Sequence, residues 1–337
     1  MHKTEIPKVS VFCVCYNHEK YMKKALESVF SQKTNFPFEV LIHDDASTDN
    51  SRNILLEYKN KYPNQVNLVL QTENQYKKGK SASTFLLPKA HGEYIAFLEL
   101  DDFWCDENKL QRQVDILEKY STVNMCIHRC QICTEEGTPV KRFIPASQYE
   151  EQVFSGSECI YDYPNKWGQT ASRMVRKSFL ISRYNSDDEY MQPKMSMGDL
   201  QEFLYASTHG STYYIPDVMS FYRENSMGSH TKRRFSDLDY AKKTLSKEKR
   251  IWEDFGAKYP QYVDVCKKQI DRTVYEEIYM RISHGNYKEY KEIYKYPLSE
   301  YTKKLSIHTR IKGWIHHNFP QSVQIWKTIK AWVKHEK

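Results

Sequence analysis

The sequence predicts an α/β fold with a mainly parallel sheet that helices cover on both faces. In the first half of the chain, short continuous apolar runs alternate with segments of helical periodicity. Apolar runs without polar alternation are typical of strands that are buried on both faces. Polar residues gather where these runs end, which is where such sheets bind ligands.

The elements of the first half follow from these patterns in chain order. The predicted strands are the apolar runs Val9–Cys15, Phe38–Ile42, Val66–Leu70 and Tyr94–Leu98. The predicted helices, in which apolar residues recur every three or four positions, are Met22–Phe30, Ile54–Tyr58, Ser83–Lys89 and Leu110–Leu117.

From Val123 onward the pattern is mixed. It predicts strands over Val123–Cys133, Trp167–Val175 and Thr212–Arg223, and a helix over Met197–Ser207. Beyond residue 231 the pattern is helical, with one long helix whose apolar face carries Val263, Cys266, Ile270, Val274 and Ile278. We therefore expect a first domain over 1–230, with halves 1–120 and 121–230, and a helical region over 231–337.

Composition excludes several classes of protein. The 337 residues are 28% charged and 40% hydrophobic, which is ordinary for a globular protein. No uncharged apolar run approaches the roughly 18 residues of a membrane-spanning helix. The apolar start VSVFCVC runs into Tyr16-Asn17-His18-Glu19 without a cleavage site, so it predicts a strand rather than a signal peptide. Eight cysteines without a secretory signal are typical of reduced thiols, and we expect a cytoplasmic protein.

Charge separates the two parts of the chain. Residues 231–337 hold 24 Lys and Arg against 13 Asp and Glu, a balance of +11, whereas the first 230 residues have −4. The tail ends in a basic amphipathic pattern with apolar positions Ile325, Trp326, Ile329, Trp332 and Val333. Such a helix suits an anionic membrane surface, or packs on the protein's own domain or a second subunit in a homo-oligomer. No nucleic-acid-binding module accompanies the positive charge, so we expect no nucleic acid partner.

Carboxylates follow two of the predicted strands. Asp44 and Asp45 end one strand, where a capped turn or a hydrogen bond to a nucleobase or ribose would explain them. Glu99, Asp101 and Asp102 end another, and three carboxylates there repel each other unless water or a cation neutralises them. Such hard oxygen ligands suit Mg²⁺ or Mn²⁺.

A compact group of sulfur and nitrogen side chains offers a zinc site as an alternative reading. Cys126, His128 and Cys130 alternate along a predicted strand, and Cys133 follows. No second ligand pair follows at zinc-finger distance, so buried thiols explain this group better.

Three ordered segments carry a resemblance to a known family. They are VSVFCVCYNHEKYMKKALESVFSQ, FEVLIHDDASTDNS and GEYIAFLELDDFW, and they resemble the nucleotide-sugar domain of family 2 glycosyltransferases over residues 7–120. A looser likeness continues through SMGDLQEFLYASTHGSTYYIPDVMSFYRENSMGSH, which is similar to the acceptor-side segment. The resemblance implies the GT-A fold and inversion at the anomeric carbon.

The resemblance also implies a donor site at the first two strand ends. Tyr16 would lie on or beside the uracil, and Asn17 would shape the turn. Asp45 would accept a hydrogen bond from the base, with Asp44 beside it. The loop lysines Lys77, Lys78 and Lys80 stand where the family often has an arginine, and the sequence does not choose among them for a diphosphate contact.

The family's Asp-x-Asp motif falls at the end of the predicted strand Tyr94–Leu98. Glu99 takes its first position, a departure from the family, and would face the ribose or the outer shell of the metal. Asp101 would coordinate Mn²⁺ or Mg²⁺ that bridges the donor diphosphate, with Asp102 in support. Asp199 occupies the position of the catalytic base, although the first turn of a helix favours an acid there without any catalysis. Arg223 would have a phosphate-side or a structural role.

Together these readings predict an inverting, metal-dependent enzyme. It would move one sugar from a UDP-sugar to a hydroxyl of a glycan acceptor on a lipid carrier, in bacterial polysaccharide biosynthesis. A lipid-linked acceptor favours the membrane as the partner of the basic tail, on the inner face of the cell membrane. The alternatives are a non-catalytic sugar-nucleotide or membrane scaffold of the same fold, and a nucleotidyltransferase. The latter would show a glycine-rich loop where this chain has CysTyrAsnHisGlu.

Overall fold

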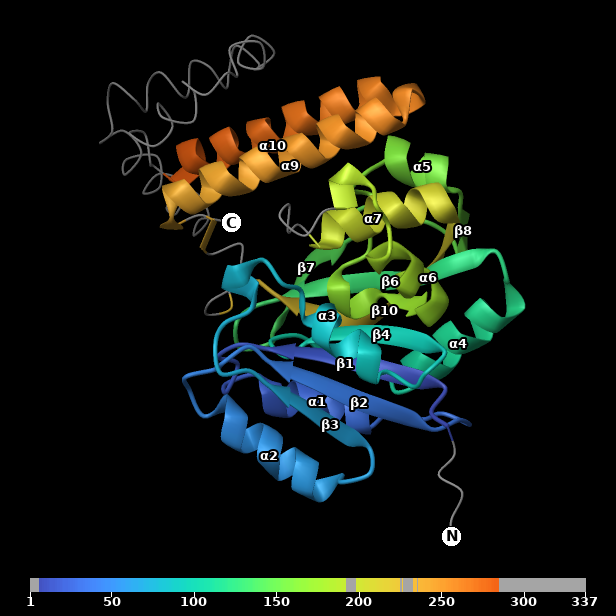
Figure 1. Ribbon diagram of the computed structural model, residues 1–337, viewed down its shortest axis with the longest axis vertical. Coiled ribbons are helices and arrows are strands. Elements are labelled where there is room, and N and C mark those ends of the chain that lie inside the picture. Colours follow the sequence, from blue (N-terminus) through green and yellow to red (C-terminus); the bar gives the residue numbers. More distant parts are fainter. Residues whose placement is uncertain (1–5, 192–197, 225, 227–232, 235, 285–337) are drawn as a thin grey trace, which may run out of the picture. The chain divides into compact units, whose positions relative to one another are not determined.

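The computed structural model describes residues 6–191, 198–224, 226, 233–234 and 236–284 (Figure 1). The chain divides into two compact units, 1–232 and 233–337. The basic pattern over residues 325–333 lies outside the described residues.

A mixed ten-stranded sheet forms the centre of the first unit. Its strands run in the order β3-β2-β1-β4-β9-β6-β10-β5, with β7 beside β6 and β8 beside β10. The first four strands, β1 (Val9–Cys15), β2 (Phe38–Asp44), β3 (Val66–Leu70) and β4 (Tyr94–Glu99), pair in parallel, as do β6 and β10. The remainder consists of β5 (Phe103–Trp104), β6 (Val123–Cys133), β7 (Pro139–Ile144), β8 (Gln152–Phe154), β9 (Met174–Arg176) and β10 (Ser211–Arg223).

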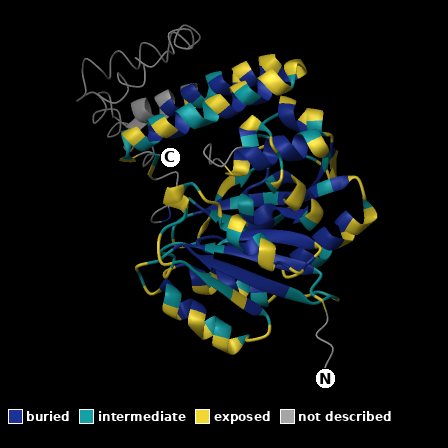
Figure 2. Ribbon diagram, in the orientation of Figure 1, coloured by how far each residue is buried: buried dark blue, intermediate teal, exposed yellow. Residues whose placement is uncertain are grey.

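Helices cover both faces of the parallel strands. Alternate residues of β1 such as Val11 and Cys13 join one buried cluster with α1 (Met22–Phe30), α2 (Ser51–Lys61) and α4 (Lys109–Lys119). Residues on the opposite face of the sheet, among them Phe12 of β1, Leu41 of β2 and Ile95 of β4, are buried as well. The strands of this part of the sheet are accordingly dark blue in Figure 2. Strands buried on both faces are what the continuous apolar runs predicted.

The remaining helices of the first unit are short, except for α7 with 12 residues. They are η1 (Tyr76–Lys78), α3 (Ala82–Leu86), η2 (Leu87–Lys89), α5 (Gly156–Tyr161), η3 (Thr170–Ser172), α6 (Lys177–Tyr184), η4 (Glu189–Met191) and α7 (Gly198–His209). Of these, η3 and α7 carry residues of the candidate site described below, among them Asp199.

One predicted strand is wrong. The segment 167–175 contains the turn η3 and only the beginning of the short strand β9. The side chain of Gln169 accepts the N–H of Ala171 at 2.6 Å and caps the turn. A Cβ at Gly168 would lie 2.5 Å from the Oγ of Ser172 and 2.8 Å from the Cγ2 of Ile127. The backbone at this position is therefore too close to its neighbours for any residue with a side chain.

The second unit contains two long helices, α9 (Leu238–Lys258) and α10 (Val263–His284), joined by η6 (Pro260–Tyr262). The predicted apolar face of α10 is buried at Cys266, Ile270 and Val274, whereas Val263, the first residue of the helix, is 39% exposed. The side chain of Ile278 lies outside the described part of the structure. Among the described residues, no helix has the length and apolar character needed to cross a membrane.

Candidate active site

Three carboxylates meet at the carboxyl end of β4. Glu99 is the last residue of the strand, and Asp101 and Asp102 follow in the next turn. One oxygen of each lies within 4.8 Å of the others. In the described part of the chain, this is the cluster of acidic, histidine or cysteine side chains that could hold a metal ion.

Asp102 is the structural member of this cluster. Its side chain is fully buried, and its two oxygens accept the backbone N–H of Arg223 at 2.8 Å and the Nε2 of Gln169 at 2.7 Å. Burial, followed by the charges of Asp101 and Glu99, raises the pKa of Asp102 well above its usual range. Asp102 therefore fixes the turn that presents the other two acids.

Asp101 and Glu99 are the members that a ligand can reach. Asp101 is 9% exposed and accepts the hydroxyl of Ser226 at 2.7 Å. Burial and then the charges of Asp101 and Asp199 raise the pKa of Glu99 to about 8, and Arg173 opposes part of this shift. Negative charges that repel each other at this distance are stabilised by a divalent cation. Carboxylate oxygens are the ligands that Mg²⁺ and Mn²⁺ prefer, so the donor set fits such an ion.

The loops after β1 and β2 are bonded to each other beside this cluster. Asn17 and Ala46 both have left-handed backbones, with φ of 58° and 62°. The N–H of Asn17 is donated to the Oγ of Ser47 at 2.9 Å, and the N–H of Thr48 is donated to the Oδ1 of Asn17 at 2.8 Å. Asn17 thus shapes the turn through its side chain as well as its backbone.

The two aspartates at the end of β2 differ in their surroundings. Asp44 is fully buried and forms an ion pair with Arg52 at 3.0 Å. Asp45 accepts the backbone N–H groups of Gln75 and Tyr76 at 2.6 and 3.1 Å, which holds the start of η1. Asp44 therefore anchors the strand end, whereas Asp45 ties it to the loop that carries the lysines.

The remaining donor-side residues lie around these loops. Tyr16 is partly buried at the end of β1. In the lysine loop, Lys78 forms an ion pair with Glu73, and the Nζ of Lys80 lies 5.9 Å from the ring centre of Phe85. Lys77, in contrast, donates its backbone N–H to Asn74.

The guanidinium of Arg223 makes its contacts with other groups of the protein. The residue is 3% exposed, its Nη1 bonds the carbonyl of Asp101, and its Nε bonds the carbonyl of Glu135 at 3.1 Å. The guanidinium also lies over the rings of Tyr21 and Phe103. These contacts favour the structural one of the two roles that the sequence left open.

Asp199 lies in the first turn of α7, and its side chain is 67% exposed. The Nη2 of the buried Arg173 lies 2.7 Å from its Oδ1. After burial and the charge of Asp101, the charge of Asp199 is a further cause of the raised pKa of Glu99. Arg173 belongs to the segment whose Gln169 bonds Asp102 at 2.7 Å, so an exposed carboxylate on a different element is linked to the acidic cluster.

Three residues of this site were not expected from the sequence. Arg173 and Gln169 hold Asp199 and Asp102, and the Nε2 of His18 lies 4.0 Å from Asp101. His18 follows Asn17 in the first motif, so its place in the sequence could have identified it as a site residue. Arg173 and Gln169 lie in the segment that was expected to be a strand, and no local pattern marks them.

The cysteine and histidine group of β6 is not arranged as a metal site. Cys126, His128, Cys130 and Cys133 are buried, and the cysteines are free thiols. Burial is the largest cause of the pKa of His128 lying well below its usual range. The expectation of buried thiols is confirmed.

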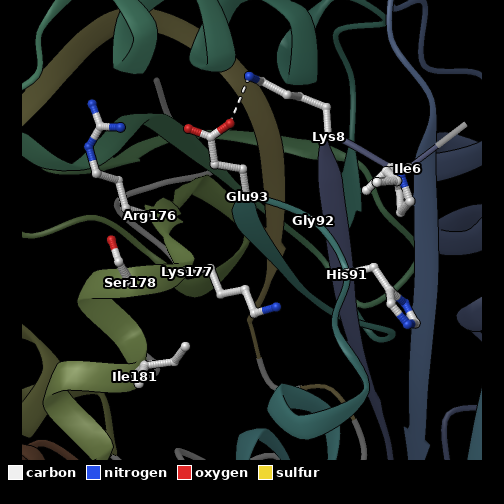
Figure 3. A pocket seen from close by; sticks show the side chains of 10 residues that line it. Ile6, Lys8, His91, Gly92, Glu93, Arg176, Lys177, Ser178 and Ile181 are labelled. Carbon is white, nitrogen blue, oxygen red and sulfur yellow. Dashed lines mark hydrogen bonds and ion pairs between the residues drawn. The ribbon is translucent and has the colours of Figure 1, made fainter.

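A pocket of about 470 Å³ lies at the opposite end of the strands (Figure 3). Lys8, which precedes β1, and Glu93, which precedes β4, line it and are bonded at 2.8 Å. Ile181 of α6 lines it from another side and is 41% exposed. None of the predicted site residues lines this pocket.

Comparison with known proteins identifies the family. The profile of glycosyl transferase family 2 matches residues 10–184, which is more than half of the chain. The uncharacterized protein Rv1520 of Mycobacterium tuberculosis is 37% identical over 140 residues, 41% of this chain and 40% of the relative. The putative teichuronic acid biosynthesis glycosyltransferase TuaG of Bacillus subtilis is 32% identical over 142 residues, 42% of this chain and 54% of the relative.

A third relative is named for its reaction. The UDP-Glc:alpha-D-GlcNAc-diphosphoundecaprenol beta-1,3-glucosyltransferase WfgD of Escherichia coli is 36% identical over 112 residues, 33% of this chain and 41% of the relative. The matched regions span about two fifths to one half of the length of these relatives. The family profile ends before Asp199 and Arg223.

Solved structures share the fold. S. aureus TarS 1–349 in complex with UDP-GlcNAc has a TM-score of 0.55 at 18% identity, over 82% of this chain and 73% of that one. The mannosyltransferase PcManGT from Pyrobaculum calidifontis, in complex with GDP-Man and Mn²⁺, has a TM-score of 0.52 at 16% identity, over 98% of this chain and 85% of that one. The predicted GT-A fold is confirmed. Its motifs, its sheet and the family profile agree, and the chain belongs to glycosyl transferase family 2.

Proposed function

We propose that this chain is an inverting, metal-dependent glycosyltransferase that moves a single sugar from a UDP-sugar to a hydroxyl of a glycan acceptor. The observation that carries the proposal is that one short segment bonds two carboxylate groups on different elements. Gln169 bonds Asp102 of the acidic cluster that ends β4, and Arg173, four residues later, bonds the exposed Asp199 on α7, each at 2.7 Å. Sugar transfer needs a site for the charged donor diphosphate, which the acidic cluster would form with a bound cation. It also needs a carboxylate near the reacting hydroxyl, which Asp199 would supply.

On the donor side, Tyr16 lies beside the base and Asp45 accepts a hydrogen bond from it. Each oxygen of Asp45 already accepts one backbone N–H. A carboxylate oxygen has two lone pairs, so each can accept a further bond from a bound base. Asn17 and Asp44 hold the two loops in place.

Asp101 and Glu99 are the residues that would hold Mn²⁺ or Mg²⁺, with Asp102 fixing their turn. A bound cation supplies charge to offset the negative charge that builds on the leaving diphosphate. Arg223, bonded to the carbonyl of Asp101, keeps this turn at the end of β4.

On the acceptor side, Asp199 acts as the general base. It takes the proton of the acceptor hydroxyl while that oxygen attacks C1 of the sugar from the face opposite UDP. The bond from C1 to the diphosphate oxygen breaks as the new bond from C1 to the acceptor oxygen forms. The configuration at C1 is therefore inverted, and UDP leaves.

The biological setting extends this proposal. TuaG is named for teichuronic acid biosynthesis, and the name of WfgD specifies a diphosphoundecaprenol acceptor. We extend these to a lipid-linked glycan acceptor for this chain, in bacterial polysaccharide assembly. Binding of the basic tail to the anionic inner face of the cell membrane belongs to the same proposal.

The test is an Asp199→Asn variant, assayed with UDP-sugars and with UDP alone. If Asp199 is the base, turnover falls by roughly 10²- to 10⁴-fold while the affinity for UDP is unchanged. The exposed Asp187 provides a matched control, and Asp187→Asn retains the wild-type rate. Unchanged turnover in Asp199→Asn would reject this role, and absence of turnover with every donor in the wild type would favour the scaffold alternative.

A further inference from the structure

Arg173 is a buried arginine that joins two carboxylates of α7. Its side chain is 2% exposed. Its Nη1 lies 2.9 Å from the Oε1 of Glu202, and its Nη2 lies 2.7 Å from the Oδ1 of Asp199 and 2.8 Å from the Oγ1 of Thr170. The two terminal nitrogens of one planar group thus hold one face of the helix.

The segment that carries Arg173 is itself fixed to the acidic cluster. We call residues 169–173 the strap. At one end of the strap, Gln169 bonds Asp102; in the middle, the carbonyl of Ala171 accepts the Nε1 of Trp104 at 2.9 Å. At the other end, the carbonyl of Arg173 accepts the N–H of Phe97 in β4 at 3.3 Å. The strap therefore links the strand that ends in Glu99 to the helix that begins beside Asp199.

Aromatic rings hold the guanidinium in place. Its central carbon lies 4.6 Å from the ring centre of Trp167 and 5.8 Å from that of Phe97. Stacking on rings and a forked set of donors are properties that arginine has and lysine lacks. Burial lowers the pKa of Arg173, but the charges of Asp199 and Glu202 raise it by more, so the group stays charged.

The two carboxylate partners differ in one decisive respect. Glu202 is buried, at 7% exposed, so its bond to Arg173 satisfies a charge inside the protein. Asp199 has a side chain that is 67% exposed, so water could satisfy its charge without any arginine. A buried cation that reaches out to an exposed acid restricts the rotation of that acid, which folding alone does not require.

We infer that Arg173 is a positioning residue for sugar transfer, which holds the carboxylate of Asp199 at a fixed place relative to the acidic cluster. The inference rests on the proposed role of Asp199 as the base. A base must lie within hydrogen-bond reach of the proton it takes, and a displacement of about 1 Å can lower a rate by about 10²-fold. Arg173 supplies this precision through a strap that is anchored on the donor side.

The first experiment compares steady-state kinetics of Arg173→Met and Arg173→Lys with the wild type. We expect Arg173→Met to lower kcat by roughly 10- to 100-fold, while the KM for the donor and the Kd for UDP change less than about twofold. Added methylguanidinium restores part of the rate in Arg173→Met, and Arg173→Lys lies between the two. A merely structural arginine would lower the melting temperature without this division between kcat and KM.

Arg176 offers a matched control three residues away. Its guanidinium bonds the backbone carbonyls of Leu117, Tyr120 and Val123, and these lie away from the acidic cluster. We expect Arg176→Met to lower the melting temperature and to leave kcat of the folded protein unchanged. If Arg173→Met does not fold, Arg173→Lys keeps the charge and carries the test alone, with kcat at least fivefold lower expected.

The second experiment asks whether Arg173 acts through Asp199. In the Asp199→Asn background, adding Arg173→Met should lower the remaining rate by less than about threefold, because coupled residues are non-additive. An undiminished 10- to 100-fold loss in that background, or a wild-type kcat in both Arg173 variants, would overturn the inference alone. Full turnover of Asp199→Asn by itself would instead reject the base assignment on which the inference rests.

Discussion

The donor side and the acceptor side of the site are held together by contacts of different kinds. On the donor side, neighbouring strand ends are bonded loop to loop, as Asn17 is to Ser47 and Thr48. On the proposed acceptor side, Asp199 is held by the buried side chain of Arg173. The contacts join residues at similar distances along the chain, 30 and 31 positions on the proposed donor side and 26 on the acceptor side. Recognisable motifs carry the donor-side residues, whereas no local pattern marks Arg173.

The largest effect we expect is on the pH dependence of stability, and it tests the role of Glu99 in the proposed donor site. The pKa of Glu99 is raised to about 8, first by burial and then by Asp101 and Asp199. Between about pH 4.3 and pH 8, the folded chain keeps a proton that the unfolded chain has lost. Glu99 therefore makes stability in EDTA fall as pH rises through this window, by at most about 1.4 kcal/mol per pH unit, and the raised pKa of Asp102 adds a fall of the same sign.

Denaturant unfolding at several pH values, with EDTA or Mn²⁺, measures this effect. Mn²⁺ should restore stability at the upper end of the window, since it binds the folded state. Glu99→Gln should flatten the pH dependence in EDTA, whereas Asp115→Asn, an exposed acid on α4, should leave it unchanged. Equal slopes for Glu99→Gln and the wild type would contradict this account.

A smaller effect is expected at Gln169, where the two sides meet. Gln169→Leu removes the bond to the buried Asp102 and the cap of η3. We expect the free energy of unfolding to fall by about 1–3 kcal/mol, because a buried carboxylate loses a partner. Gln111 provides the control, because its side chain also makes two bonds, to Asp115 and from the N–H of Asn35, but both are exposed. Gln111→Leu should cost less than about 0.5 kcal/mol. Equal losses in the two variants would show that the strap is not anchored through Asp102.

The smallest effects lie in the donor loops, at their two left-handed residues. Ala46→Gly should stabilise the fold by up to about 1 kcal/mol, because φ of 62° strains alanine and not glycine. Asn17→Gly should destabilise it by about 1 kcal/mol, because the side chain that accepts the N–H of Thr48 is lost. Thermal unfolding gives both signs, and a matching sign in the two variants would refute the distinction.

The sequence predicted the parallel strands well because β1, β2 and β4 are mostly apolar runs buried on both faces. Val9–Cys15 and Val66–Leu70 match β1 and β3, and the acids lie at the carboxyl ends of β2 and β4 as expected. The segment 167–175 could not be predicted, because a side-chain cap and a close approach at Gly168 define its turn. Nor could the role of Arg173, since arginine is mostly a surface residue and its partners become neighbours only in the fold.

The central claim is that the end of β4 is a metal-dependent site for a uridine nucleotide. The most direct test is calorimetric titration with UDP in Mn²⁺ and then in EDTA, with GDP and CMP as controls. The account predicts that UDP binds in Mn²⁺ and that this binding disappears in EDTA and in Asp101→Ala, but persists in Asp115→Ala. No binding of UDP with any metal, or equal binding by Asp101→Ala, would contradict it.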